Sequence, residues 1–108
     1  RAAAAAAREL LEETGYGANE LVHLGGFQPT NGISPHHAEL YAALDCELVQ
    51  HPEPGPCEEL SVHVKSEREV RQRLVHGDFA DGFTALALFY YFSSPRSAGH
   101  PRADRGAV

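Results

Sequence analysis

The feature that most constrains this chain is its opening segment, a run of strong helix formers. Six consecutive alanines, Ala2–Ala7, lead directly into a leucine-containing stretch that continues to Thr14. Alanine has the highest helix propensity and leucine follows closely, so the sequence predicts a helix over residues 2–14. Gly15 stands where a residue in the left-handed conformation would end that helix. Whatever else the chain builds, it must pack a helix of about this length.

The alanine run also lowers the real content of core-forming side chains. The chain has 108 residues, the size of one domain, and 43% of them are hydrophobic, including those six alanines. Its net charge is −6, with 15 acidic and nine basic side chains. Because there is no basic patch, we expect neither a nucleic acid nor an anionic membrane as partner. No apolar run approaches the roughly 20 residues that span a bilayer.

Strand signals follow the predicted helix. Glu20–Leu24 is a short strand candidate, and Gly25–His36, rich in glycine and proline, is predicted to be a loop. From Leu40 to Leu48 apolar and polar residues alternate, which predicts one half-buried strand with Cys46 on its buried face. Gln50–Glu59, with its three prolines, is predicted to be a second loop.

The next segment combines a strand signal with a helix start. Leu60–Lys65 alternates between apolar and polar residues, which predicts a further strand. Ser66, followed three residues later by Glu69, forms a capping box, and Gly77 is expected to close the helix that it starts. The apolar stripe expected on this helix consists of Val70, Leu74 and Val75.

A last helix completes the pattern. Asp81 is expected to cap a helix over Gly82–Phe92, which is apolar almost all round and is therefore predicted to be buried. Its aromatic end, Phe89–Phe92, is expected to pack against a sheet. The order of helix, strands, helix and helix predicts an α/β or α+β domain over residues 1–92, with few strands. Residues 93–108 have the composition of a disordered tail.

The cysteines and histidines leave a metal alternative open. Cys46 and Cys57 lie eleven residues apart and lack the close pairing of a zinc knuckle, so they are read as reduced thiols of a cytoplasmic protein. A zinc site would have to combine His36, His37 and His51, with or without Cys57, in a spacing that matches no structural zinc motif.

Three glutamates give the first helix a distinct acidic face. Glu9, Glu12 and Glu13 are spaced i, i+3 and i+4 and project within a wedge of about 100°. Like charges at this spacing repel, and the helix dipole disfavours negative charge in the last turn. A divalent cation would relieve both penalties, because carboxylate oxygens are ligands that magnesium prefers. The alternative is a solvated acidic face.

The string from Arg8 to Tyr16 resembles the second half of the Nudix box, G-x5-E-x7-R-E-U-x-E-E-x-G-U, in which U is bulky and apolar. The seven matching positions are Arg8, Glu9, Leu10, Glu12, Glu13, Gly15 and Tyr16. In this register the first box glutamate would immediately precede Arg1, and the first box glycine would lie six residues earlier. The chain, which contains no methionine, is therefore expected to be an interior piece of a longer protein, inactive and marginally stable by itself.

The resemblance implies a role for each matched residue. Glu9, Glu12 and Glu13 look like metal-binding glutamates, Glu12 among the catalytic residues, and Arg8 looks like the arginine that orients one of them. In Nudix hydrolases, metal ions held in this way bind a diphosphate and activate water. The implied cofactor is Mg²⁺, with Mn²⁺ possible, and the implied fold is a partial α/β/α sandwich with a mixed sheet.

Three further blocks are similar to the ADP-ribose pyrophosphatase and nucleoside-diphosphate-sugar hydrolase branch. They are Gly25–Ser34, Glu58–Val64 and Gly77–Thr84. This similarity implies hydrolysis of ADP-ribose or a related nucleoside-diphosphate sugar to a nucleoside monophosphate and a sugar phosphate, by a protein that can form a homodimer. The alternative is a Nudix-like module that binds or senses such a nucleotide without hydrolysing it.

The chain departs from this branch at two loops. Pro35, His36 and His37 stand where an acidic residue is common, and Pro56 stands where the general base is usually found. The candidate bases that remain are Glu58 and Glu53. The candidate substrate contacts in the first loop are Phe27, which can stack on a base or pack under the sheet, His36 and His37.

Overall fold

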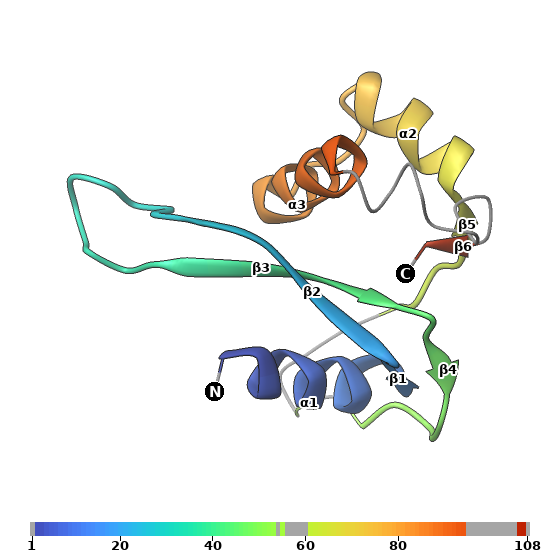
Figure 1. The fold of residues 1–108 in the computed structure, drawn as a ribbon. Coiled ribbons are helices and arrows are strands. Elements are labelled where there is room, and N and C mark those ends of the chain that lie inside the picture. Colours follow the sequence, from blue (N-terminus) through green and yellow to red (C-terminus); the bar gives the residue numbers. More distant parts are fainter. Residues whose placement is uncertain (1, 54, 56–60, 95–105, 108) are drawn as a thin grey trace. The chain divides into compact units, whose positions relative to one another are not determined.

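A computed structural model describes residues 2–53, 55, 61–94 and 106–107, which form two compact units, Arg1–Ser61 and Val62–Val108. The first unit contains α1 (Ala2–Thr14), β1 (Tyr16–Gly17), β2 (Glu20–Phe27), β3 (Ala38–Leu44) and β4 (Glu47–Leu48) (Figure 1). The second contains β5 (Lys65–Ser66), α2 (Glu67–Val75), α3 (Gly82–Ser93) and β6 (Gly106–Ala107). The predicted α/β class is therefore confirmed. The described strands form three two-stranded antiparallel sheets, β1–β4, β2–β3 and β5–β6.

Helix α1 has the predicted bounds and packs against β1, β2 and β3. It ends at Gly15, which is buried and has a φ of +82°, and the Gly15 N–H donates to the carbonyl oxygen of Leu11 at 2.9 Å. An L-residue with a side chain is disfavoured in this left-handed conformation, which explains why a glycine ends the helix. Thr14 caps the last turn by donating its hydroxyl to the Leu10 carbonyl at 2.7 Å.

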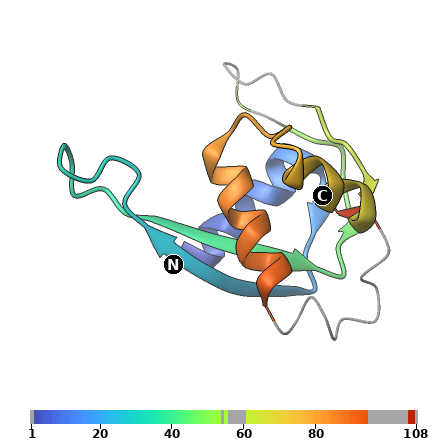
Figure 2. The same cartoon turned by 90° about the horizontal axis from the view of Figure 1, so that it is seen from above.

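Strand β2 extends beyond its predicted end. Gly25 and Gly26, which were expected to begin a loop, pair with Leu40 and Glu39 of β3. The register shifts between His23 and Gly25, so the glycines mark an irregularity inside the strand and not its end. The result is the long β2–β3 hairpin seen in Figures 1 and 2, whose connecting loop spans residues 28–37.

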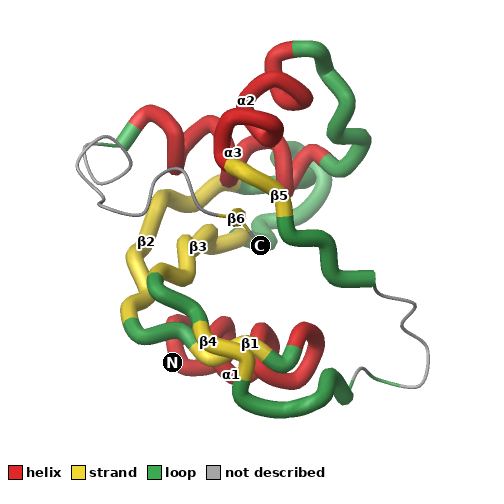
Figure 3. Tube along the Cα trace, turned by 90° about the vertical axis from the view of Figure 1, so that its right-hand side faces the viewer, coloured by secondary structure: helices red, strands yellow, loops and turns green. Residues whose placement is uncertain are grey.

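The single strand predicted over Leu40–Leu48 is wrong, because the structure breaks it in two. Asp45 adopts a positive φ of 52°, which interrupts the pleat, and its carbonyl accepts a hydrogen bond from the Asn19 side-chain amide at 2.8 Å. After this turn the chain no longer pairs with β2. Strand β4 pairs instead with β1, next to α1 (Figure 3). Leu44 is buried, whereas Leu48 is 68% exposed.

The core of the first unit lies under β3. Leu40 and Leu44 are buried there, as their common parity predicted. Cys46 follows the strand and is only half-buried. Burial raises the pKa of the Cys46 thiol, and the neighbouring Asp45 charge adds to this effect. The thiol is thus kept protonated, as expected of a small apolar side chain.

Helix α2 confirms the predicted cap and most of the predicted stripe. The Ser66 hydroxyl accepts a hydrogen bond from the Glu69 N–H at 3.1 Å, and Gly77 follows the helix with a φ of +78°. Val70 and Leu74 are buried, but Val75 is 81% exposed, so the stripe is narrower than predicted.

Helix α3 packs on α2 through its aromatic end. The Tyr91 hydroxyl donates to the buried Glu67 carboxylate at 3.3 Å, and the Arg71 guanidinium lies 4.2 Å from the centre of the Phe92 ring. No described residue of α3 is fully buried, and Phe89 is 53% exposed. The prediction of a buried helix is therefore wrong. Tyr91 and Phe92 contact α2, and the packing of the aromatic end on a sheet stays a prediction.

Asp81 caps α3 as predicted and gives a pH-dependent contribution to stability. Its carboxylate accepts from the Phe83 N–H at 3.2 Å and from the Thr84 hydroxyl at 2.8 Å. The Thr84 hydrogen bond lowers the pKa of Asp81 below its ordinary value. Since the folded-state pKa is the lower one, the stabilisation is complete above the ordinary pKa and disappears as the pH falls through the lowered value.

We expect Asp81→Ala to reduce the free energy of unfolding by about 1 kcal/mol at pH 7, because an N-cap is lost. The difference from the unsubstituted chain should shrink as the pH falls below about 4. Urea denaturation at pH 7 and at pH 3, followed by circular dichroism, measures both values. Asp78→Ala is the matched control, since Asp78 is an exposed carboxylate outside the helix. An Asp81→Ala deficit that is equal at both pH values would contradict the prediction.

The segment after the predicted Gln50–Glu59 loop also differs from the sequence expectation. Ser61–Val64 is not a strand, and Val64 is 60% exposed; only Lys65 and Ser66 pair, with β6. Leu60 lies outside the described residues. The predicted tail over 93–108 also lies mostly outside them, but Ser93 ends α3 and Gly106–Ala107 form β6. Within the described part of the chain, no helix is long and apolar enough to cross a membrane.

Candidate active site

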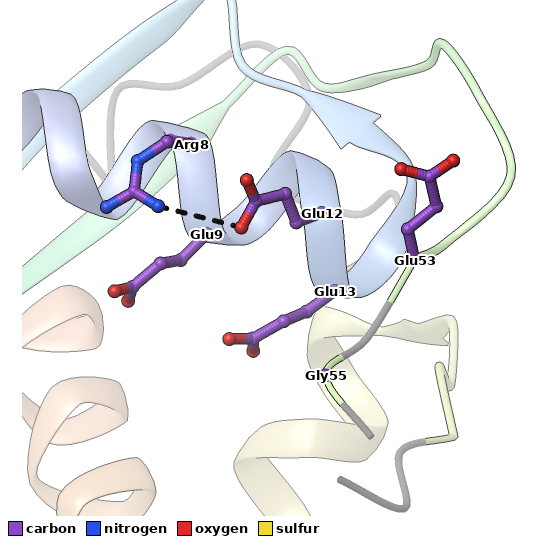
Figure 4. A pocket seen from close by; sticks show the side chains of 6 residues that line it. All are labelled: Arg8, Glu9, Glu12, Glu13, Glu53 and Gly55. Atoms are coloured by element: carbon purple, nitrogen blue, oxygen red, sulfur yellow. Dashed lines mark ion pairs between the residues drawn. The ribbon is translucent and has the colours of Figure 1, made fainter. Parts of the chain in front are cut away.

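The acidic face of α1 forms one side of a cavity of about 410 Å³. The residues that line this cavity are Arg8, Glu9, Glu12, Glu13, Glu53 and Gly55 (Figure 4). Figure 4 shows the carboxylates of Glu9 and Glu13 extending to the same side of the helix, as their i, i+4 spacing requires. The helix prediction therefore places the three glutamates together, and the loop after β4 adds a fourth carboxylate.

Arg8 forms an ion pair with Glu12, at 3.7 Å between Nη1 and Oε1. Both side chains are about half exposed, and an arginine N-terminal to its glutamate is the weaker i, i+4 orientation. The pair therefore contributes little to stability, at most a few tenths of a kcal/mol. Its effect is positional, because it restricts the directions that the Glu12 carboxylate takes. The orienting role expected for Arg8 stays a prediction.

The loop that carries Glu53 is bonded to the C-terminal end of α1. The N–H groups of Val49 and Gln50 both donate to the carbonyl of Gly15, at 2.8 and 3.2 Å, and the Glu53 N–H donates to the carbonyl of Glu12. The Glu12 carbonyl belongs to the last turn of the helix, where such acceptors have no partner within the helix, and Gly15 directly follows that turn. The loop thus satisfies the helix end and brings Glu53 beside Glu12.

The donor chemistry of this cavity fits a hard divalent cation. Its ligand atoms are carboxylate oxygens, which suit Mg²⁺ and Mn²⁺ and not a soft metal. Among the residues that the structure describes, however, no three His, Cys, Asp or Glu side chains converge closely enough to hold a metal ion. Because Glu9 and Glu53 are exposed, rotation of their side chains is fast and costs little. The site is therefore identified by the backbone positions of these glutamates, on α1 and in the loop that carries Glu53, and not by their side-chain rotamers.

Comparison with known protein families identifies the family of the chain that forms this cavity. The model of the NUDIX domain family matches residues 1–87, which include every described residue of the cavity. The chain belongs to the NUDIX domain family. Members of this family are generally pyrophosphohydrolases that act on nucleotide derivatives and use divalent metals, so the match supports a hydrolase of the Nudix type. No curated protein matches the chain.

The other predicted site residues of this Nudix domain lie away from the cavity or outside the description. Phe27 is half-buried at the end of β2. His36 is exposed in the connecting loop, where its N–H donates to the Ser34 hydroxyl at 3.1 Å. None of the substrate-loop candidates lines the cavity. Glu58, Pro56 and Cys57 lie outside the described residues. Of the two candidate bases, the structure places only Glu53.

A polar cluster on the Nudix hairpin is absent from the sequence predictions. The two oxygens of the Glu39 carboxylate contact Nε2 of His23 at 2.6 Å and Nε2 of His37 at 3.0 Å. Gly26 lies opposite Glu39, and a Cβ on Gly26 would come within 2.7 Å of both Glu39 and His37. The available signal was the shared parity of His37 and Glu39, but the strand had been predicted to start later. His37, which immediately precedes β3, thus contacts a carboxylate of that strand.

Proposed function

We propose that this Nudix domain is a metal-dependent hydrolase that cleaves the diphosphate of ADP-ribose or a related nucleoside-diphosphate sugar. The observation that carries the proposal is the cavity, which is lined by the three glutamates of the Nudix box on α1 and by Glu53 of the loop that follows β4. The segments Gly25–Ser34 and Gly77–Thr84 are similar to the nucleoside-diphosphate-sugar hydrolase branch. This similarity supports a sugar diphosphate as substrate over a nucleoside triphosphate.

In this proposal Glu9, Glu12 and Glu13 hold Mg²⁺, with Mn²⁺ as a substitute. When bound, the ion supplies charge neutralisation to the diphosphate and acidifies the attacking water. Arg8 restricts the Glu12 carboxylate through their ion pair. Water attacks one phosphorus, and the bond from that phosphorus to the bridging oxygen breaks. The products are a nucleoside monophosphate and a sugar phosphate.

Glu53 is proposed as the group that accepts the proton of the attacking water. Its backbone is held beside Glu12 by a hydrogen bond, and its side chain is exposed and free to rotate toward the cavity. Figure 4 shows its carboxylate extending away from those of Glu9 and Glu13, so the proposed role requires that rotation. Glu58 is the remaining candidate, and comparison of Glu53→Gln with Glu58→Gln distinguishes the two.

The second candidate function is a module that binds a nucleotide without hydrolysing it. The observation that favours this function is the lack of three converging metal ligands among the residues described. Such a module would bind a diphosphate sugar in the presence or absence of Mg²⁺ and would release no product.

A substrate panel with the full-length protein tests the proposed function. We expect ADP-ribose or another diphosphate sugar to be hydrolysed at least about 10-fold faster, in kcat/KM, than nucleoside triphosphates, with all activity lost in EDTA and restored by Mg²⁺. Chromatography of the nucleotide products gives the rates and shows which bond is cleaved. Preference for triphosphates would remove the branch assignment. Binding without product at saturating Mg²⁺ would support the second candidate.

A further inference from the structure

We infer that Gly15 is a positioning residue for catalysis. Only a glycine at this position lets the Val49–Glu53 segment lie against the end of α1, and this contact places Glu53 at the cavity. This inference rests on the proposed function. It gives Gly15 a role besides ending the helix, namely holding the Val49–Glu53 segment against α1. In it, Gly15 acts through Glu53 and touches neither metal nor substrate.

The close approach of the backbone at Gly15 is the first observation. A Cβ built on Gly15 would lie 2.1 Å from the carbonyl oxygen of Gln50 and 3.2 Å from its carbonyl carbon. Real Cβ atoms do not approach a backbone oxygen so closely. Since the neighbour is backbone and not the end of a flexible side chain, any side chain at position 15 must displace the segment as a whole.

The second observation is the series of hydrogen bonds that this approach permits. Val49 and Gln50 donate to the Gly15 carbonyl, and Glu53 donates to the Glu12 carbonyl. All three donors belong to exposed residues, so little else protects their amides from water. Displacing the segment by the distance that a Cβ needs would break these bonds. Glu53 would then lose its fixed position beside Glu12.

A comparison with Gly77 separates this effect from ordinary helix termination. Gly77 ends α2 with a φ of +78°, close to the +82° of Gly15, and its N–H also donates to a helix carbonyl. A Cβ on Gly77, however, would meet nothing within 4 Å. Alanine at either position would strain a left-handed backbone by about 1–2 kcal/mol, but only at position 15 would it also displace a loop.

The test combines these variants with Glu53→Gln. Gly15→Asn is the main variant, because asparagine tolerates the left-handed conformation and keeps the helix end while it adds the Cβ. Gly15→Ala is the second variant and Gly77→Asn is the matched control. Amide hydrogen exchange at Val49, Gln50 and Glu53, measured by NMR on the full chain, reports docking of the segment. The kcat of metal-dependent ADP-ribose hydrolysis reports its consequence.

We expect Gly15→Asn to speed exchange at these three amides by at least about 10-fold and Gly77→Asn to leave it within about 2-fold. Glu53→Gln should lower kcat by about 100-fold, and Gly15→Asn by a comparable factor. The double variant Gly15→Asn with Glu53→Gln should be no slower than Glu53→Gln alone, because a residue that acts through Glu53 has no effect once Glu53 is lost. A merely structural loss would multiply the two effects.

Three results would overturn the inference and leave the proposed function intact. They are unchanged amide exchange in Gly15→Asn, full activity in Glu53→Gln, and multiplicative losses in the double variant. If the full-length protein hydrolyses no diphosphate sugar in Mg²⁺, the proposed function fails and the positioning role of Gly15 fails with it. The amide exchange then shows separately whether the loop docks as the structure describes.

Discussion

Glu12→Gln and Glu13→Gln are each expected to lower the kcat of Mg²⁺-dependent hydrolysis by about 100-fold or more, with the fold retained. Loss of a group that merely supports a metal ligand costs 10- to 100-fold in many metalloenzymes, so loss of a ligand itself should cost at least as much. Glutamine has nearly the same size and removes only the negative charge. Because it also relieves repulsion on the helix face, we expect the thermal midpoint to stay the same or rise.

The measurement is initial-rate hydrolysis over a range of Mg²⁺ concentrations, with a thermal melt of each variant. Glu47→Gln is the matched control, because Glu47 is an exposed glutamate of the same unit, in β4, and does not line the cavity. Wild-type rates in both Glu12→Gln and Glu13→Gln would mean that the acidic face of α1 is a solvated surface. The proposed metal site would then be abandoned.

The second large effect concerns stability. It compares Leu44 with Leu48, two leucines that one continuous strand would place on the same face. Leu44→Ala is expected to reduce the free energy of unfolding by about 3 kcal/mol, because Leu44 is 6% exposed and its removal leaves a cavity under β3. For a chain of this size the thermal midpoint should fall by about 10–20 °C. Leu48→Ala should change the stability by less than about 0.5 kcal/mol, because Leu48 is 68% exposed.

Urea denaturation followed by far-UV circular dichroism measures both variants, since the chain contains no tryptophan. The comparison distinguishes the broken β3–β4 arrangement from the single strand that alternation alone predicts. Equal losses for Leu44→Ala and Leu48→Ala would show that both side chains share one buried face, and the turn at Asp45 would then be wrong.

The sequence by itself determined the elements that depend on local interactions. Helix α1 and its end at Gly15, the Ser66 cap of α2 and the Asp81 cap of α3 all occur where propensity and capping predicted them. The clustering of the box glutamates follows from the same local rule, because helical spacing alone puts them on one face. The Nudix family, too, was evident from these residues.

Only the tertiary structure decided the features that depend on pairing partners. Alternation predicted that Leu48 is buried like Leu44, but the left-handed turn at Asp45 redirects β4 toward β1. Glycines predicted a loop at Gly25, but β3 supplies a partner that keeps them in a strand. Glu53 is held at the cavity by a backbone hydrogen bond to Glu12, 41 positions earlier in the chain. No local sequence pattern encodes a contact that depends on where the chain returns.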